Sequence, residues 1–125
     1  MIVDTNALSA MADGDSVLES VLQDASMVAL PVIALGEYRY GVRGSRHKVK
    51  YEKWLADLSE SCRILNVDEA TTEFYAGIRT ELKRTGQPIP GNDVWIAALA
   101  RQHALPVLSR DHHFDLVPGL RRIRW

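Results

Sequence analysis

The chain has 125 residues, 46% of them hydrophobic, and its 15 basic and 16 acidic residues leave a formal net charge of −1. This length predicts one domain with one core, and the overall charge favours no class of partner. No apolar run reaches the ~20 residues needed to cross a bilayer, which excludes a membrane span. A single cysteine, Cys62, excludes an internal disulfide. Because the first residues show no signal-peptide pattern, we expect a cytoplasmic protein.

Short apolar runs and longer helical patterns alternate along the chain. The runs typical of strands are residues 1–3, 27–30, 63–67, 106–109 and 120–125. Apolar residues at helical spacing predict helices around 17–22, 45–60, 69–84 and 92–103. We expect two helices after each of the first three strands and none between the last two strands. Strands that alternate with helices predict an α/β fold: a three-layer α/β/α sandwich with a mainly parallel sheet of about five strands.

Four carboxylates follow or flank these predicted elements. Asp4 and Asp111 follow the first and fourth strands, Glu37 lies in the helix after the second strand, and Asp93 lies in the first turn of the last helix. We expect Asn92 to cap that helix and the helix dipole to keep Asp93 ionised. Taken singly, each acid has a structural interpretation as a turn former, a helix-start residue or a solvated helical acid. Because reactive groups gather beyond the carboxyl ends of parallel strands, the four together predict an acidic pocket.

Such a pocket predicts a bound cation. Three or four neighbouring carboxylates raise one another's pKa and cannot all stay ionised without one. Hard oxygen ligands suit Mg²⁺, with Mn²⁺ as a substitute, and these ions promote phosphodiester hydrolysis. We expect Asp4 and Asp93 to be the principal metal ligands, and Glu37 and Asp111 to complete the shell or orient a water. Asp115 is the alternative to Asp111 as the acid that completes the pocket.

Four motifs, "VDTN", "GEYRYG", "NDVWIAALA" and "LSRDHHFDLVPGLR", resemble in this order the acidic motifs of PIN-domain ribonucleases. The short chain also resembles the VapC toxins of type II toxin–antitoxin systems. The resemblance runs over essentially the whole chain and implies a single PIN domain at residues 1–125. It further implies a Mg²⁺-dependent endoribonuclease, a homodimer and a cognate VapB-like antitoxin whose tail blocks the site. The catalytic acids that it implies are Asp4, Glu37, Asp93 and Asp111.

Polar residues around these acids also match the family pattern. Thr5 and Asn6 occupy the polar positions after the first acid, where a hydroxyl or amide can hold a carboxylate or a water. Ser109 stands where the last motif often has Thr, and it retains the hydroxyl. The four histidines lack the spacing of zinc ligands, and we interpret them mostly as solvent or phosphate contacts.

Other functions fit the sequence less well. A haloacid-dehalogenase-type phosphatase needs a second Asp where this chain has Asn6, and a receiver-like phosphoacceptor would have to use Asp68, which is poorly placed. The sequence contains no Gly-rich phosphate-binding loop, so a nucleotide cofactor has no support. A PIN-like module that processes RNA without being a toxin, or that only binds RNA or protein, is the remaining alternative, although loss of catalysis should remove acids that are all present.

Positive charge gathers in two segments. Residues 39–53 hold six Lys or Arg against one acid, and the last five residues hold three Arg. Such runs are typical either of a solvated helix face or of a polyanion-binding surface, and we expect them to guide RNA. Trp54 and Trp95 lie among apolar helical positions, which favours packing over base stacking.

Overall fold

The computed structural model describes all 125 residues, and its centre is a five-stranded sheet in the order β3-β2-β1-β4-β5. Every neighbouring pair of strands is parallel. The strands are Ile2–Val3 (β1), Ala29–Pro31 (β2), Arg63–Leu65 (β3), Val107–Leu108 (β4) and Arg122–Ile123 (β5). The parallel sheet predicted from the sequence is therefore confirmed.

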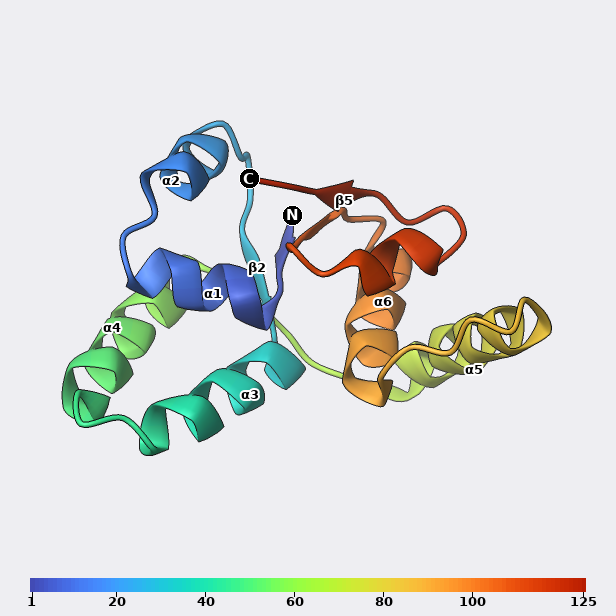
Figure 1. Ribbon diagram of the computed structural model, residues 1–125, viewed down its shortest axis with the longest axis horizontal. Coiled ribbons are helices and arrows are strands. Elements are labelled where there is room, and N and C mark those ends of the chain that lie inside the picture. Colours follow the sequence, from blue (N-terminus) through green and yellow to red (C-terminus); the bar gives the residue numbers. More distant parts are fainter.

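Helices connect the strands in the predicted order, with one addition. The α-helices are Thr5–Ala12 (α1), Ser16–Gln23 (α2), Val32–Arg43 (α3), Lys48–Ser61 (α4), Glu69–Arg84 (α5) and Gly91–His103 (α6). The addition is a short 3₁₀ helix, η1 at His112–Leu116, which the sequence patterns do not predict. Figure 1 shows α1 to α4 gathered on one side of the molecule and α5 and α6 on the other. None of these helices is both long and apolar enough to cross a membrane.

Two apolar cores cover the two faces of the sheet. Successive side chains of a strand point to opposite faces. Ile2 therefore packs into the core formed with α5 and α6, and Val3 packs into the core formed with α1 to α4. Val107 and Leu108 divide between the two cores in the same way. This arrangement confirms the three-layer α/β/α sandwich.

The strand order changes direction at the centre of the sheet. From β1 the chain moves outward through β2 to β3, and later strands β4 and β5 add on the opposite side of β1. In open α/β sheets, ligands bind beyond the carboxyl ends of the strands at such a switch point. Asp4 and Ser109, which directly follow β1 and β4, lie at this point.

The start of α6 differs from the prediction. The helix begins at Gly91 after Pro90, and no side chain caps it. Asn92 is the second helical residue, so the prediction that Asn92 caps this helix is wrong. The prediction that Trp54 is a packing residue is confirmed, because it contacts the α1 to α4 core. Trp95 stacks on Tyr75 of α5, with ring centroids 3.9 Å apart.

Candidate active site

Asp4 is a buried carboxylate at the carboxyl end of the central strand, with 4% of its surface exposed. It accepts hydrogen bonds from the Thr5 backbone N–H at 2.7 Å, from Ser109 Oγ at 2.7 Å and from Asn6 Nδ2 at 3.1 Å. Burial raises its pKa to about 6, and the charges of Asp93 and Glu37 act in the same direction. The fold therefore fixes the orientation of this carboxylate, although burial destabilises its ionised form.

The Ser109 hydroxyl links the first acid to the last motif. This fully buried side chain donates to Asp4 and accepts from the Asp111 backbone N–H at 2.9 Å. The amide of Asn6 spans the same junction, because it donates to Ser109 Oγ at 3.1 Å and accepts from the Arg110 N–H at 3.1 Å. The polar residues of the first and last motifs thus hold the ends of β1 and β4 together.

A second group of side chains, which could bind a metal ion, lies near Asp4. Asp93 is the third residue of α6, and its side chain is 13% exposed. His113 Nδ1 lies 2.8 Å from Asp93 Oδ2 and 3.0 Å from Asp111 Oδ1. Burial raises the pKa of Asp93, and the hydrogen bond to Asp93 raises the pKa of His113. One ligand atom from each of these three side chains lies within 4.8 Å of the others, so together they could hold a metal ion.

His113 is a site residue that the sequence interpretation missed. The interpretation of the histidines as mostly solvent or phosphate contacts does not hold for His113, whose Nδ1 lies between two carboxylates. The sequence signal for its role is its position two residues after Asp111, since η1 turns its ring back toward that carboxylate. Asp111 caps η1 by accepting from the His113 N–H at 2.9 Å, which fixes this geometry.

Glu37 of α3 contributes a buried oxygen without a partner. Its Oε1 atom is shielded from solvent and accepts no hydrogen bond from the protein. Burying a carboxylate oxygen in this way is costly unless a cation or a water satisfies it. Glu37 lines the same hollow as Thr5, the residue after Asp4, and its charge contributes to the raised pKa of Asp4. This unsatisfied oxygen, together with the neighbouring carboxylates, fits a hard divalent cation.

Asp115 pairs with Arg122 and is not a member of the group formed by Asp93, Asp111 and His113. Its two carboxylate oxygens accept from Arg122 Nε at 2.8 Å and Nη2 at 2.7 Å, and this pairing lowers its pKa to about 2. Arg122 also donates to the Ser109 carbonyl at 3.1 Å. Of the two alternatives for the last acid, the structure brings only Asp111 next to Asp93. Arg122, with a side chain 2% exposed, is likewise not free to guide RNA.

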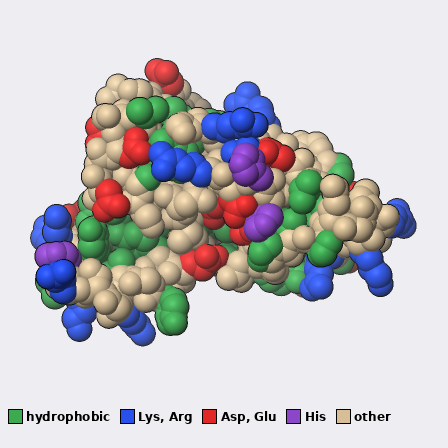
Figure 2. Space-filling view, in the orientation of Figure 1, with side chains coloured by type: hydrophobic (Ala, Val, Ile, Leu, Met, Phe, Trp, Pro, Cys, Tyr) green, Lys and Arg blue, Asp and Glu red, His purple; other side chains and the backbone are tan.

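On the molecular surface, the acidic side chains and histidines gather near the middle of one face, with Lys and Arg beside them (Figure 2). Residues 1–120 match the family model described as "PIN domain". The chain belongs to the PIN-domain family. The acids of its four motifs lie near one another in this PIN domain, as the contacts around Asp4 and Asp93 show.

Relatives of this PIN domain include proteins named as ribonucleases and a protein named as a toxin. Ribonuclease VapC5 of Mycobacterium tuberculosis is 32% identical over 120 residues, which are 94% of this chain and 87% of that protein. The structure of FitAcB from Neisseria gonorrhoeae aligns with a TM-score of 0.81 and 29% identity over 98% of this chain and 95% of that one. VapBC2 from Rickettsia felis, bound to a promoter DNA fragment, gives a TM-score of 0.90 at 24% identity, covering 99% and 97% of the two chains. At 24% identity, the similarity to VapBC2 is evidence for a shared fold only.

The metal-free PIN domain should become more stable on acidification from about pH 8 to pH 5. The pKa of Asp4 is about 6 in the folded protein against its usual 3.8. The Asp4 carboxyl therefore binds a proton more readily in the folded than in the unfolded state. The stability that this proton contributes is lost as the pH rises through 6. The raised pKa values of Asp93 and His113 act in the same direction. Between pH 8 and pH 5 the shift in the Asp4 pKa contributes about 1.4 kcal/mol, and the full effect of about 3 kcal/mol is reached only below the usual pKa of 3.8.

Urea unfolding in the presence of a chelator at both pH values measures this effect. Asp4→Asn should be more stable than the wild type at pH 8 and should show a weaker pH dependence. Asp57→Asn, the same substitution at an exposed position of α4, should behave like the wild type. Equal pH dependence in all three proteins would contradict the assignment of the titrating group.

Proposed function

We propose that this chain is a Mg²⁺-dependent endoribonuclease, with Mn²⁺ as a substitute, and that it acts in the cytoplasm as the toxin of a VapBC-type pair. Residues 1–125 would act as a single PIN domain. The observation that carries this proposal is the gathering of Asp4, Glu37, Asp93 and Asp111 at the switch point of the sheet, with Glu37 Oε1 left unsatisfied. Membership of the PIN-domain family and the likeness to VapC ribonucleases support it.

Each acid has a proposed role that follows from its surroundings. Asp4 and Asp93 would be the principal metal ligands, and Asp111 would complete the shell. The bound cation would polarise the phosphodiester and stabilise the negative charge that develops on it. Ser109 and Asn6 hold the Asp4 carboxylate, and His113 orients those of Asp93 and Asp111. Glu37 Oε1, free of other partners, would accept a hydrogen bond from the attacking water.

Expression in a bacterial host tests the toxin role. The chain expressed alone should arrest growth and produce new RNA ends, and co-expression with the product of its neighbouring open reading frame should restore growth. The purified protein should lose cleavage in EDTA and regain it with Mg²⁺. Harmless expression of a folded, active nuclease would contradict the toxin role and favour the alternative, RNA processing by a PIN-like domain. A folded protein that binds RNA but never cleaves it would favour a binding module.

Two hollows suit the proposed antitoxin. One, of about 360 Å³, lies against α2 and α4 and is mostly apolar, with Leu22, Met27 and Leu58 among its lining. The other, of about 260 Å³, lies between α1, α3 and α4 and reaches Glu37. We propose that a VapB-like antitoxin lays an apolar helix against helices 14–24 and 31–60. An Arg of the antitoxin would then pair with Asp93 or Glu37 and compete with the cation. A homodimer of the toxin is part of this proposal.

The basic segment 39–53 should contribute to RNA binding. Arg43, Arg46 and Lys48 are exposed and form no ion pair with a carboxylate. For single-stranded RNA, the slope of log affinity against log salt should fall by about 0.7 for each phosphate that the protein no longer neutralises. Changing all three residues to Gln should therefore weaken binding and flatten the salt dependence, as measured by fluorescence anisotropy. Unchanged affinity and slope would make this segment a solvated helix face.

A further inference from the structure

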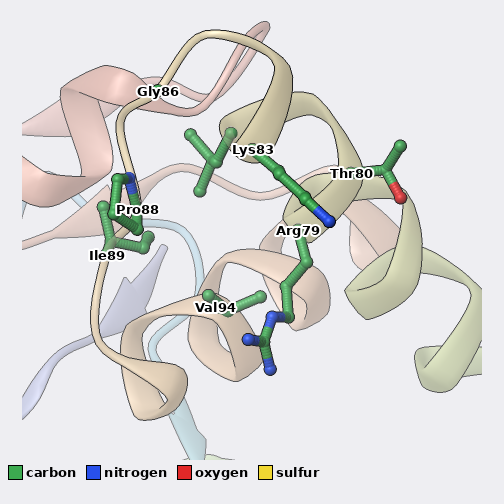
Figure 3. A pocket seen from close by; sticks show the side chains of 8 residues that line it. Arg79, Thr80, Lys83, Gly86, Pro88, Ile89 and Val94 are labelled. Carbon is green, nitrogen blue, oxygen red and sulfur yellow. The ribbon is translucent and has the colours of Figure 1, made fainter.

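A pocket of about 470 Å³ lies between α5, the loop 85–90 and the first turn of α6, outside the acidic site. Arg79 and Lys83 line it from α5, and Val94 lines it from α6. Figure 3 shows the two basic side chains extending from α5, with the Arg79 guanidinium lying toward Val94. No Asp or Glu lines this pocket.

The two cations of this pocket have no carboxylate partner. Arg101, Arg110 and Arg122 each form an ion pair with an acid, whereas Arg79 and Lys83 form none. Two positive charges that line one pocket repel each other, and an anion would relieve that repulsion. The charges on its wall therefore favour a negatively charged occupant.

Aromatic side chains hold Arg79 in place. Its Nη1 donates to the Tyr75 hydroxyl at 2.9 Å, and its guanidinium carbon lies 5.6 Å from the Tyr75 ring centroid. Tyr75 in turn stacks on Trp95. A guanidinium carries five N–H donors, and the structure uses one of them for a side-chain hydrogen bond. The remaining donors can form the paired hydrogen bonds that phosphate oxygens accept.

The rim of the pocket is preformed. Gly86 adopts a φ of +66°, which ends α5 in a turn where the Gly86 N–H donates to the Lys83 carbonyl and the Gln87 N–H donates to the Leu82 carbonyl. Pro88 follows in the loop, and its ring restricts the backbone. Little backbone conformational entropy is then lost when a ligand enters.

The pocket adjoins the acidic site through α6. Val94 follows Asp93 directly, so their Cα atoms lie about 3.8 Å apart. In a helix with 3.6 residues per turn their side chains point about 100° apart. The pocket and the catalytic acid thus occupy neighbouring sides of one helical turn. We propose that Arg79 and Lys83 bind a backbone phosphate of the RNA substrate that flanks the cleaved one, an inference that rests on the proposed ribonuclease function.

Binding measurements separate this role from catalysis. Arg79→Gln and Lys83→Gln would be compared with Arg84→Gln, which removes one charge from an exposed position of the same helix outside the pocket. Affinity for a labelled oligouridylate would be measured by anisotropy at several salt concentrations in an Asp93→Asn background, which keeps the RNA intact. Unfolding curves would verify that all variants are folded.

We expect Arg79→Gln to weaken binding roughly tenfold, because it removes charge-assisted hydrogen bonds, and to reduce the salt slope by about 0.7. Lys83→Gln should act in the same direction, and Arg84→Gln should have little effect. A methylphosphonate oligomer of the same bases, which lacks backbone charge, should bind the wild type and Arg79→Gln equally.

Wild-type affinity and salt slope in Arg79→Gln would overturn the inference, even if Asp93→Asn abolishes cleavage and so upholds the proposed function. Weaker binding of an acidic protein partner with unchanged RNA binding would also overturn it. If the wild-type protein cleaves no RNA, the proposed function fails, and a lower salt slope in Arg79→Gln would still support a phosphate site in this pocket.

Discussion

RNA cleavage should fall by roughly a hundredfold or more when Asp93 or Asp4 is replaced by Asn, because loss of a partner outside the metal shell already costs about 10- to 100-fold in metal-dependent enzymes. The substitution keeps the volume of the side chain and removes its charge. Both carboxylates have raised pKa values from burial, so their ionised forms destabilise the metal-free fold. We therefore expect the same variants to lose activity and to gain stability in the absence of metal.

A loss of cleavage activity together with a gain in stability distinguishes a functional acid from a structural one. Cleavage rates and urea unfolding would be measured on the same preparations, with Asp57→Asn as the control for the chemical change at an exposed position. Mapping RNA ends after brief expression of the wild type and of Asp93→Asn would identify the cleavage sites. Full activity of purified Asp4→Asn would rule out its role as a metal ligand.

The largest effect on stability is expected at Phe114. Its side chain is fully buried in η1 and belongs to the core formed with α5 and α6. Replacing a buried Phe by Ala costs ~3–5 kcal/mol, a large share of the roughly 5–15 kcal/mol that stabilises a typical domain. Because Phe114 directly follows His113, a cavity here would also loosen the turn that orients Asp111 and His113.

Equilibrium unfolding in urea measures the first effect, and cleavage under native conditions measures the second. Phe114→Leu leaves a smaller cavity and should retain the fold, with an intermediate stability, if Phe114→Ala does not fold. A loss below about 1 kcal/mol in Phe114→Ala would show that the core collapses around the cavity, and that η1 is not anchored by this ring.

Local patterns in the sequence determined the order of elements. The helix expected at 69–84 has the bounds Glu69–Arg84, because Asp68 and Thr71 form a capping box at its start and two basic residues, Lys83 and Arg84, lie in its last turn. Alternating short apolar runs and helical patterns likewise predicted the parallel sheet. These features depend on residues within one or two turns of each other. The prediction that Asn92 caps α6 failed because two local signals indicate different starts of this helix. Asn92 is a typical capping residue, but the helix already begins at Gly91, directly after Pro90.

The sequence motifs predicted Asp4, Glu37 and Asp93 as acids of one site, but only the tertiary structure decided between Asp111 and Asp115 and added His113. Asp111 and Asp115 are chemically identical and four residues apart, so no local pattern separates them. Packing of β5 beside β4 brings Arg122 to Asp115, and η1 turns Asp111 and His113 toward Asp93 on α6. The unsatisfied oxygen of Glu37 and the unpaired cations of Arg79 and Lys83 also depend on which elements pack together. Spacing along the chain encodes the elements, whereas contacts between distant segments are set by the packing of the two cores.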